Sequence, residues 1–335
     1  MNQQVHLRFY CNIVALLSVL VCMPVNQARS DSAKLDWKQL PSIPDRHGFA
    51  GAFSGVSHGA LIVAGGANFP DAMPWEGGQK VWHDSIFILP GIGGHWLTGF
   101  KLPHPLGYGI SVTTSSGVLC CGGSDAQQHF ADVFLLTWRD GKIETKKFPP
   151  LPQPLANGCG AVVGNVLYIA GGIDTSFATN ALNNFWSLDL SKANAGWRQL
   201  DPWPGPPRML SVAGTLHGNF YLFSGVSLKG DAAGKPVRQY LTDAYCFVPG
   251  HGWKRIADLP RAAVAAPSPA ADFGDQLLIV SGDDGRLVNF EPKSAHPGFP
   301  RTVLYYESRA DNGLSLAILR YRGRLRRWPY GIRWL

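Results

Sequence analysis

The feature of this sequence that most limits its fold is an apolar run that recurs five times and always ends in glycine. The runs are LIVAGG, LCCGG, LYIAGG, YLFSG and LLIVSG, and they end at Gly66, Gly123, Gly172, Gly225 and Gly282. Successive glycines lie 49 to 57 residues apart, a period that fits one four-stranded blade of a β-propeller. Because a lone blade cannot bury both of its faces, such units have to stack against one another.

Each repeat contains the same parts in the same order. A strand of small residues such as GYGISVT leads into the apolar run, and a polar residue then opens an aromatic-rich strand such as HDSIFIL or NNFWSL. Tryptophan follows in HWLTGF, GWRQL and GWKRI, whereas the second repeat has KIETKKF at that point. Paired glycines allow positive φ and a close backbone approach, and the aromatic side chains can fill the space between blades.

A double glycine followed by a tryptophan resembles the kelch repeat, and the paired signatures of WD40 propellers do not recur here. We therefore predict an all-β fold, a kelch-type β-propeller in which six blades are expected, five are recognisable and the sixth is incomplete. The segment DWKQLP at 36–41 resembles a fourth strand with no first three before it. We predict that it forms the outer strand of the sixth blade, whose other strands would come from the C-terminal side.

The two ends of the chain differ in composition from the repeats. A basic start, an apolar run over 9–23 and small residues within 28–30 predict that residues 1–30 are a signal peptide. The mature protein would then begin near Asp31, lie in the periplasm and have no membrane contact after cleavage. An uncleaved anchor and a lipoprotein modified at Cys22 are the alternatives.

The propeller is expected over residues 37–306, followed by a basic tail at 307–335 in place of the last blade. Residues 308–335 hold seven arginines and one aspartate and so carry most of the formal net charge of +7. The basic character therefore belongs to the tail, and we expect no nucleic-acid partner. A tail that binds an anionic partner and a truncated or out-of-frame end of the coding sequence both fit this composition.

Four cysteines lie within the repeats, at Cys120, Cys121, Cys159 and Cys246. The adjacent pair lies in a strand-like run, so its two side chains should point to opposite faces and should not form a disulfide. The other two cysteines fall in different repeats without a framework spacing. We expect buried free thiols, and the histidine and cysteine spacings predict no metal site.

From Trp37 to about Tyr306, the sequence resembles the sialic acid mutarotase (N-acetylneuraminate epimerase) family, in a circularly permuted form. The resemblance rests on six motifs: LIVAGGANFP at 61–70, WHDSIFIL at 82–89, PLGYGIS at 105–111, LCCGGSD at 119–125, GGIDT at 171–175 and PPR at 206–208. It implies an enzyme that interconverts the α and β anomers of sialic acid by acid-base ring opening, with no cofactor. The partner would be this small-molecule sugar, while the oligomeric state stays open.

The family's acid-base segment, Gly-Glu-x-x-Pro-Gly-x-Arg, does not occur in this chain. We therefore assign no catalytic residue, and both an active mutarotase and an inactive copy stay open. The alternative function is a non-catalytic kelch module that binds a glycan or a protein. A copper radical oxidase is disfavoured because the His, Tyr and Cys residues that it needs form no visible constellation.

Candidate substrate-binding residues can be placed by the alternation of strand direction within a blade. The loops after the glycine runs share one face with the loops that join successive blades, and polar residues there would form a mouth at which a sugar binds. The candidates are Arg208, Tyr108, Arg46, Asn157, Asp125 and Asn68. Arg208 and Tyr108 lie in motifs that resemble the family.

Overall fold

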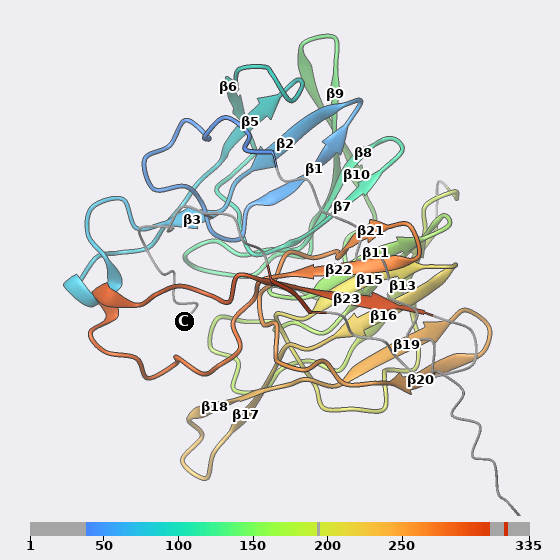
Figure 1. Cartoon of the computed structure of the whole chain (residues 1–335). Helices are drawn as coiled ribbons and strands as arrows, with labels where there is room; N and C mark the ends of the chain where they lie inside the picture. The colour runs from blue at the N-terminus through green and yellow to red at the C-terminus, as the bar shows by residue number, and fades with distance from the viewer. Residues whose placement is uncertain (1–37, 193–194, 309–317, 321–335) are drawn as a thin grey trace, which may run out of the picture. The chain divides into compact units, whose positions relative to one another are not determined.

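The computed structural model describes residues 38–192, 195–308 and 318–320, and within them it contains five four-stranded antiparallel sheets, or blades (Figure 1). Blade one consists of β1 (Phe53–Ser57), β2 (Ala60–Ala64), β5 (Ser85–Leu89) and β6 (Leu97–Lys101). Blade two consists of β7 (Ile110–Thr114), β8 (Gly117–Cys121), β9 (Val133–Arg139) and β10 (Lys142–Phe148). Blade three consists of β11 (Cys159–Val163), β12 (Val166–Ala170), β13 (Phe185–Asp189) and β14 (Arg198–Gln199).

Blade four consists of β15 (Val212–Leu216), β16 (Asn219–Phe223), β19 (Ala244–Val248) and β20 (Gly252–Ile256), and blade five of β21 (Ala271–Phe273), β22 (Gln276–Val280), β23 (Thr302–Glu307) and β24 (Ile318–Arg320). Two small hairpins extend from the loops, β3 (Ala67–Asn68) with β4 (Val81–Trp82) and β17 (Val226–Gly230) with β18 (Pro236–Tyr240). Two 3₁₀ turns, Pro74–Glu76 and Lys293–Ala295, are the helical elements of the described residues, and neither is long enough to cross a bilayer. The predicted all-β propeller is confirmed.

Each pair of neighbouring blades shares one apolar cluster, which is where the core lies. Cys120 belongs to the cluster between blades one and two, whereas Cys121 belongs to the cluster between blades two and three. Adjacent strand residues thus serve different interfaces, as the alternation of side chains requires. All four cysteines of the repeats are buried and free, which confirms the prediction for them.

The glycine pairs bring successive blades into backbone contact. In blade one, Gly65 and Gly66 both have positive φ, and the amide of Gly66 donates to the carbonyl of Leu106 in the loop leading into blade two. A Cβ atom on Gly65 would lie 2.1 Å from that carbonyl oxygen, so only glycine fits. In blade four the first position is Ser224, whose hydroxyl accepts a hydrogen bond from the amide of Ala263 in the next blade. Between blades four and five, a side-chain hydroxyl thus takes the place of the direct backbone contact.

One residue in each blade adopts a left-handed conformation where the chain enters the first strand. These residues are Gly51, Tyr108, Asn157, Leu210 and Ala265, with φ between 54° and 62°. Each amide donates to the carbonyl of its counterpart in the preceding blade, over 2.7 to 2.9 Å from Tyr108 to Ala265. We call this chain of four hydrogen bonds the left-handed arc. It fixes the spacing of the five blades where they approach one another most closely.

In blades one, three and four, a tryptophan at or just before the outer strand bonds to the segment that precedes the blade. The indole N–H donates to a backbone carbonyl in three bonds, Trp96 to Pro41, Trp197 to Pro149 and Trp253 to Asp201. Pro41 therefore takes the place that the last residues of blades two and three take for the blades after them. However, residues 38–41 form no strand, so the prediction of a strand at 36–41 is wrong for that part. The reason is that none of the described strands lies beside it to complete a ladder.

The C-terminal side of blade five differs from the sequence-based expectation. Strand β24 (Ile318–Arg320) lies within the segment predicted to be a basic tail, and it pairs antiparallel with β23. Ladder bonds are made by the backbone, so a strand can form there without the usual aromatic signature. Within the described ranges there is no sixth four-stranded sheet. The predicted signal peptide at 1–30 lies outside the described residues.

Candidate functional site

Two sets of loops meet on one face of the blades. In every blade, the residue before the left-handed arc pairs with the residue after the glycine run through an isolated β-bridge, for example Gly107 with Ser124 and Ala156 with Ile173. Four of the predicted site residues, Asn68, Tyr108, Asp125 and Asn157, each directly follow a residue of such a bridge. The bridges therefore bring these loop positions together at the inner end of the blades. We call this region the mouth.

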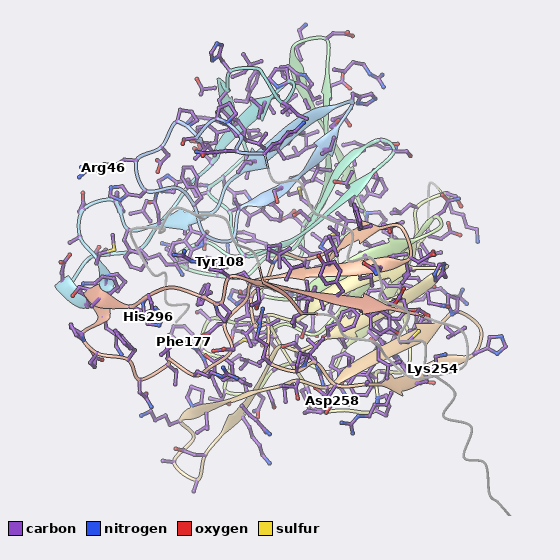
Figure 2. The ribbon with its side chains drawn as sticks, viewed as in Figure 1. Arg46, Tyr108, Phe177, Lys254, Asp258 and His296 are labelled. Atoms are coloured by element: carbon purple, nitrogen blue, oxygen red, sulfur yellow. The ribbon has the colours of Figure 1, made fainter. Side chains whose placement is uncertain are left out.

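Tyr108 is the most central of these residues. It lies on the left-handed arc and is buried, and its ring covers Gly51, where a Cβ atom would lie 2.4 Å from a ring carbon. Its ring meets that of Trp82 edge to face, with 6.2 Å between centroids. Burial raises the pKa of the phenol well above its ordinary value, so the side chain stays neutral at physiological pH. Figure 2 labels Tyr108 among the side chains of the described residues.

Asn68 lies in the wall of the mouth and is almost completely buried. Its amide nitrogen donates to the carbonyl of Gly48 (2.9 Å), and its amide oxygen lies 2.8 Å from Nε2 of His83. Because the amide oxygen only accepts, Nε2 of His83 carries the proton and Nδ1 the lone pair. Burial lowers the pKa of His83 even though Asp45 and Asp84 raise it, so the ring is neutral at pH 7.

His129 occupies a similar position on the loop that follows the second glycine run. Its Nδ1 lies 3.3 Å from the carbonyl oxygen of Ile173 and therefore carries the proton, which leaves the lone pair on Nε2. Burial lowers the pKa of His129, while Asp174 and Asp125 act in the opposite direction. The result is a half-buried neutral imidazole beside two carboxylates, which can both take and return a proton.

Other predicted site residues are half-buried or exposed, and they are Asp125, Asn157 and Arg46. One oxygen of Asp125 accepts from the amides of Gln127 and Gln128, both at 2.8 Å, so it shapes its own loop. Asn157 is half-buried on the left-handed arc, next to Tyr108. Arg46 is exposed (Figure 2), in a turn where Asp45 accepts hydrogen bonds from two backbone amides.

Arg208 does not reach the mouth, in contrast to the expectation for this residue. Its side chain has no exposed surface, and all three guanidinium nitrogens are engaged, by the carbonyls of Pro206 and Ser224 and by the carboxylate of Asp243. The guanidinium also lies over the rings of Trp203 and Tyr245. The side chain of Arg208 thus binds to blade four, while its backbone carbonyl accepts a hydrogen bond from the amide of Gly172 in blade three. Because the side chain is completely buried, a substrate in the mouth does not reach it in this conformation.

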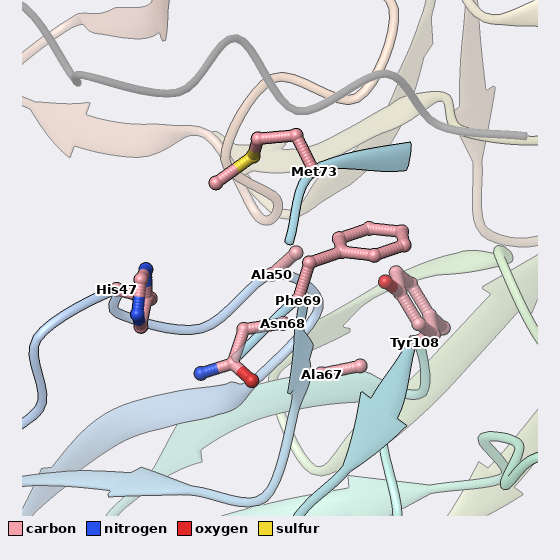
Figure 3. Close-up of a pocket in the computed structure, with 7 residues that line it drawn as sticks. All are labelled: His47, Ala50, Ala67, Asn68, Phe69, Met73 and Tyr108. Carbon is pink, nitrogen blue, oxygen red and sulfur yellow. The ribbon is translucent and has the colours of Figure 1, made fainter. Parts of the chain in front are cut away.

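A small cavity opens beside Tyr108, as Figure 3 shows. It is lined by His47, Ala50, Ala67, Asn68, Phe69, Met73 and Tyr108. Its volume of about 20 Å³ has room for one water molecule or a methyl group, whereas a sugar-sized ligand needs several hundred Å³. The cavity can therefore serve only as a subsite for one substituent, with the rest of a ligand in the open mouth.

Several residues of the mouth were not identified from the sequence. These are Asp45, Lys80, Trp82, His83 and His129. Trp82 and His83 lie in the motif WHDSIFIL, which did mark the region, but their partners come from other loops. The described residues contain no group of three or more His, Cys, Asp or Glu side chains that could hold a metal ion.

The fold and the mouth define a kelch-type β-propeller with its polar site at the inner ends of the blades. The profile of the N-acetylneuraminate epimerase family matches residues 18–145 and 148–290, so the chain belongs to that family. The circular permutation that we expect from the sequence stays a prediction.

Individual relatives match over shorter stretches. The N-acetylneuraminate epimerase of Salmonella typhi is 41% identical over 138 residues, which cover 36% of this chain and 35% of the relative. That of Yersinia pestis is 35% identical over 125 residues, or 32% of this chain and 31% of the relative. The matched stretches thus span about a third of the curated relatives. The solved structure of YjhT superimposes with a TM-score of 0.70 at 13% identity, covering 86% of this chain and 89% of YjhT, and supports the fold.

Proposed function

We propose that this protein interconverts the α and β anomers of N-acetylneuraminate. The family match over residues 18–145 and 148–290 is the observation that carries the proposal. The relatives from Salmonella and Yersinia are named for the same activity. The mouth is compatible with it, because it combines neutral imidazoles, amides and aromatic rings, the groups that contact sugars and transfer protons.

The reaction requires two proton transfers. One group takes the proton of the anomeric hydroxyl as the ring opens, and another gives a proton to the ring oxygen; the reverse steps close the ring on the other face. In the mouth, His129 Nε2 and His83 Nδ1 hold lone pairs in the tautomers fixed by their hydrogen bonds. Both imidazoles are neutral near pH 7, since burial lowers their pKa values. We propose His129 as the first candidate for the proton transfer, because two carboxylates lie near it to stabilise its charged form.

The proposal can be tested by following the equilibration of the anomers. A freshly dissolved pure anomer of N-acetylneuraminate would be observed by proton NMR with and without the purified protein, and with the Salmonella relative as a positive control. We expect exchange to accelerate in proportion to the protein concentration. Exchange at the buffer rate, with the relative active in the same buffer, would refute the proposed activity.

The absence of Gly-Glu-x-x-Pro-Gly-x-Arg from the sequence favours a second function, a kelch module that binds a glycan without turnover. The same NMR samples separate the two functions. Binding of the sugar without faster exchange would support the module, whereas faster exchange would exclude it.

We also propose that the protein is exported to the periplasm, which its first thirty residues support as a signal peptide. N-terminal sequencing of the protein recovered from a periplasmic extract is the test. A sequence that starts near Asp31 is expected. A retained Met1 in the cytosolic fraction would contradict export.

A further inference from the structure

Lys80 is held between two aromatic rings at the edge of the mouth. Its Nζ atom lies 4.2 Å from the centroid of the Tyr108 ring and 5.0 Å from that of Trp82. The two rings come from different repeats: Trp82 lies on strand β4 of the hairpin between β2 and β5, and Tyr108 lies on the left-handed arc at the entry to blade two. The ammonium therefore occupies a position defined by the packing of two blades.

The ammonium of Lys80 has no counter-charge among the described residues. Its contacts there are the two rings, without a carboxylate in an ion pair and without a hydrogen-bond acceptor. The side chain is half-buried, and burial lowers its pKa to about 8, so it is still mostly protonated at pH 7. A partly desolvated cation without an anion is unfavourable unless a ligand supplies the negative charge.

The other lysine of this blade with a described partner shows the contrast. Lys101 is exposed and lies 3.0 Å from the carboxylate of Asp84, as expected of a surface ion pair. Contacts with aromatic rings stabilise a cation only weakly, and they leave the N–H donors of the ammonium without a hydrogen-bond acceptor. A purely structural cation–π contact thus accounts for the position of Lys80 but does not supply acceptors for these donors.

The surroundings of Lys80 favour one class of ligand. Tyr108 also lines the small cavity, whose other walls include the apolar side chains of Ala50, Phe69 and Met73. A cation, neighbouring aromatic rings and a methyl-sized apolar cavity fit a sugar that carries both a carboxylate and a small apolar substituent. We propose, resting on the function proposed above, that Lys80 binds the carboxylate of the acidic sugar and is positioned for this by Trp82 and Tyr108.

The test compares N-acetylneuraminate with its methyl ester, in which the carboxylate is masked. Dissociation constants would be measured by calorimetry for the wild-type protein, Lys80→Gln, Lys80→Arg and, as a matched surface control, Lys142→Gln on the outer strand β10. Loss of a hydrogen bond to a charged group predicts about 10- to 100-fold weaker binding of the free acid by Lys80→Gln. Lys80→Arg and Lys142→Gln should stay within about threefold of wild type, and the ester should bind wild type and Lys80→Gln equally.

Thermal unfolding of each variant shows whether it is folded, and Lys80→Arg tests the role of the charge even if Lys80→Gln is unstable. Equal weakening for acid and ester, unchanged binding by Lys80→Gln, or no binding of the acid by wild type would overturn the assignment. Binding that depends on Lys80 without faster anomer exchange would support the subsite and refute only the proposed turnover. Exchange that is accelerated equally by wild type and Lys80→Gln would refute the subsite and leave the function standing.

Discussion

Asp243 Oδ2 lies 2.6 Å from Nη2 of Arg208, and the side chains of this ion pair are almost completely buried. Tyr245 donates a second hydrogen bond to the same oxygen over 2.7 Å. The pair thus connects the loop that enters blade four with the start of its third strand. It is the buried charge pair of the described residues. Its removal should therefore lower the free energy of unfolding of the propeller.

Replacing Arg208 with methionine should strongly destabilise the protein, because the carboxylate of Asp243 would be left buried without its partner. The expected loss is about 3–5 kcal/mol in the free energy of unfolding, measured by urea denaturation. Arg255→Gln is the matched control, since Arg255 makes an exposed pair with Asp258 and should cost at most about 1 kcal/mol. Similar losses in the two variants would mean that the buried Arg208 pair contributes no more to the free energy of unfolding than an exposed pair does.

The same pair predicts how stability depends on pH. Burial by itself would raise the pKa of Asp243, but the hydrogen bond and charge of Arg208 overcome this and lower it below its ordinary value. A carboxyl with a lowered folded-state pKa stabilises the fold above its unfolded pKa of about 3.9, and this contribution is lost as pH falls through the folded-state value. The stability gap between wild type and Asp243→Asn should therefore narrow below about pH 4. A gap that stays constant from pH 7 to pH 3 would contradict the assignment.

His129→Gln tests the proton transfer proposed for the mouth. Glutamine keeps a donor for the carbonyl of Ile173 but cannot exchange a proton, so kcat for anomer exchange should fall about 100- to 10,000-fold while KM changes little. The exposed His251→Gln variant serves as the control and should match wild type. If His129→Gln keeps full kcat, the proton is transferred by another group.

The blades could be predicted from the sequence because their strongest signal is local. A glycine pair such as Gly65-Gly66 is required where the backbone has positive φ and a neighbouring carbonyl leaves no room for a Cβ atom. Alternating apolar runs then place the strands on either side. Even so, Ser224 shows that the rule is not strict, because its hydroxyl takes the hydrogen bond from the amide of Ala263 in the next blade.

The site was harder to predict, because its contacts join residues from different repeats. The motif PPR suggested a binding role for Arg208, yet the partner that decides its role, Asp243, lies 35 residues further along the chain. Lys80 was not identified for the same reason, since no pattern in its own loop shows that it meets Tyr108. Strand β24 carried no signature because it pairs through its backbone within an arginine-rich segment.

The last prediction concerns Gly51, whose close contact with Tyr108 connects the left-handed arc to the proposed carboxylate subsite. A Cβ atom at this position would lie 2.4 to 2.9 Å from three atoms of the Tyr108 ring. Gly51→Ala should therefore displace the ring and with it the aromatic support of Lys80. We expect weaker binding of N-acetylneuraminate, about tenfold or more, and a smaller effect on its methyl ester, because the displaced group is the one that binds the carboxylate.

Gly59→Ala is the matched control for this change. Gly59 also has positive φ, at 80°, but nothing lies within 4 Å of a Cβ atom there. Both variants therefore share the cost of a left-handed alanine, about 1–2 kcal/mol in stability, and only Gly51→Ala adds the collision with the ring. Calorimetry with the acid and the ester, on samples shown to be folded by thermal unfolding, separates the two effects. If both alanine variants bind the acid equally well, the position of Tyr108 does not control the site, and the connection between the arc and ligand binding is wrong.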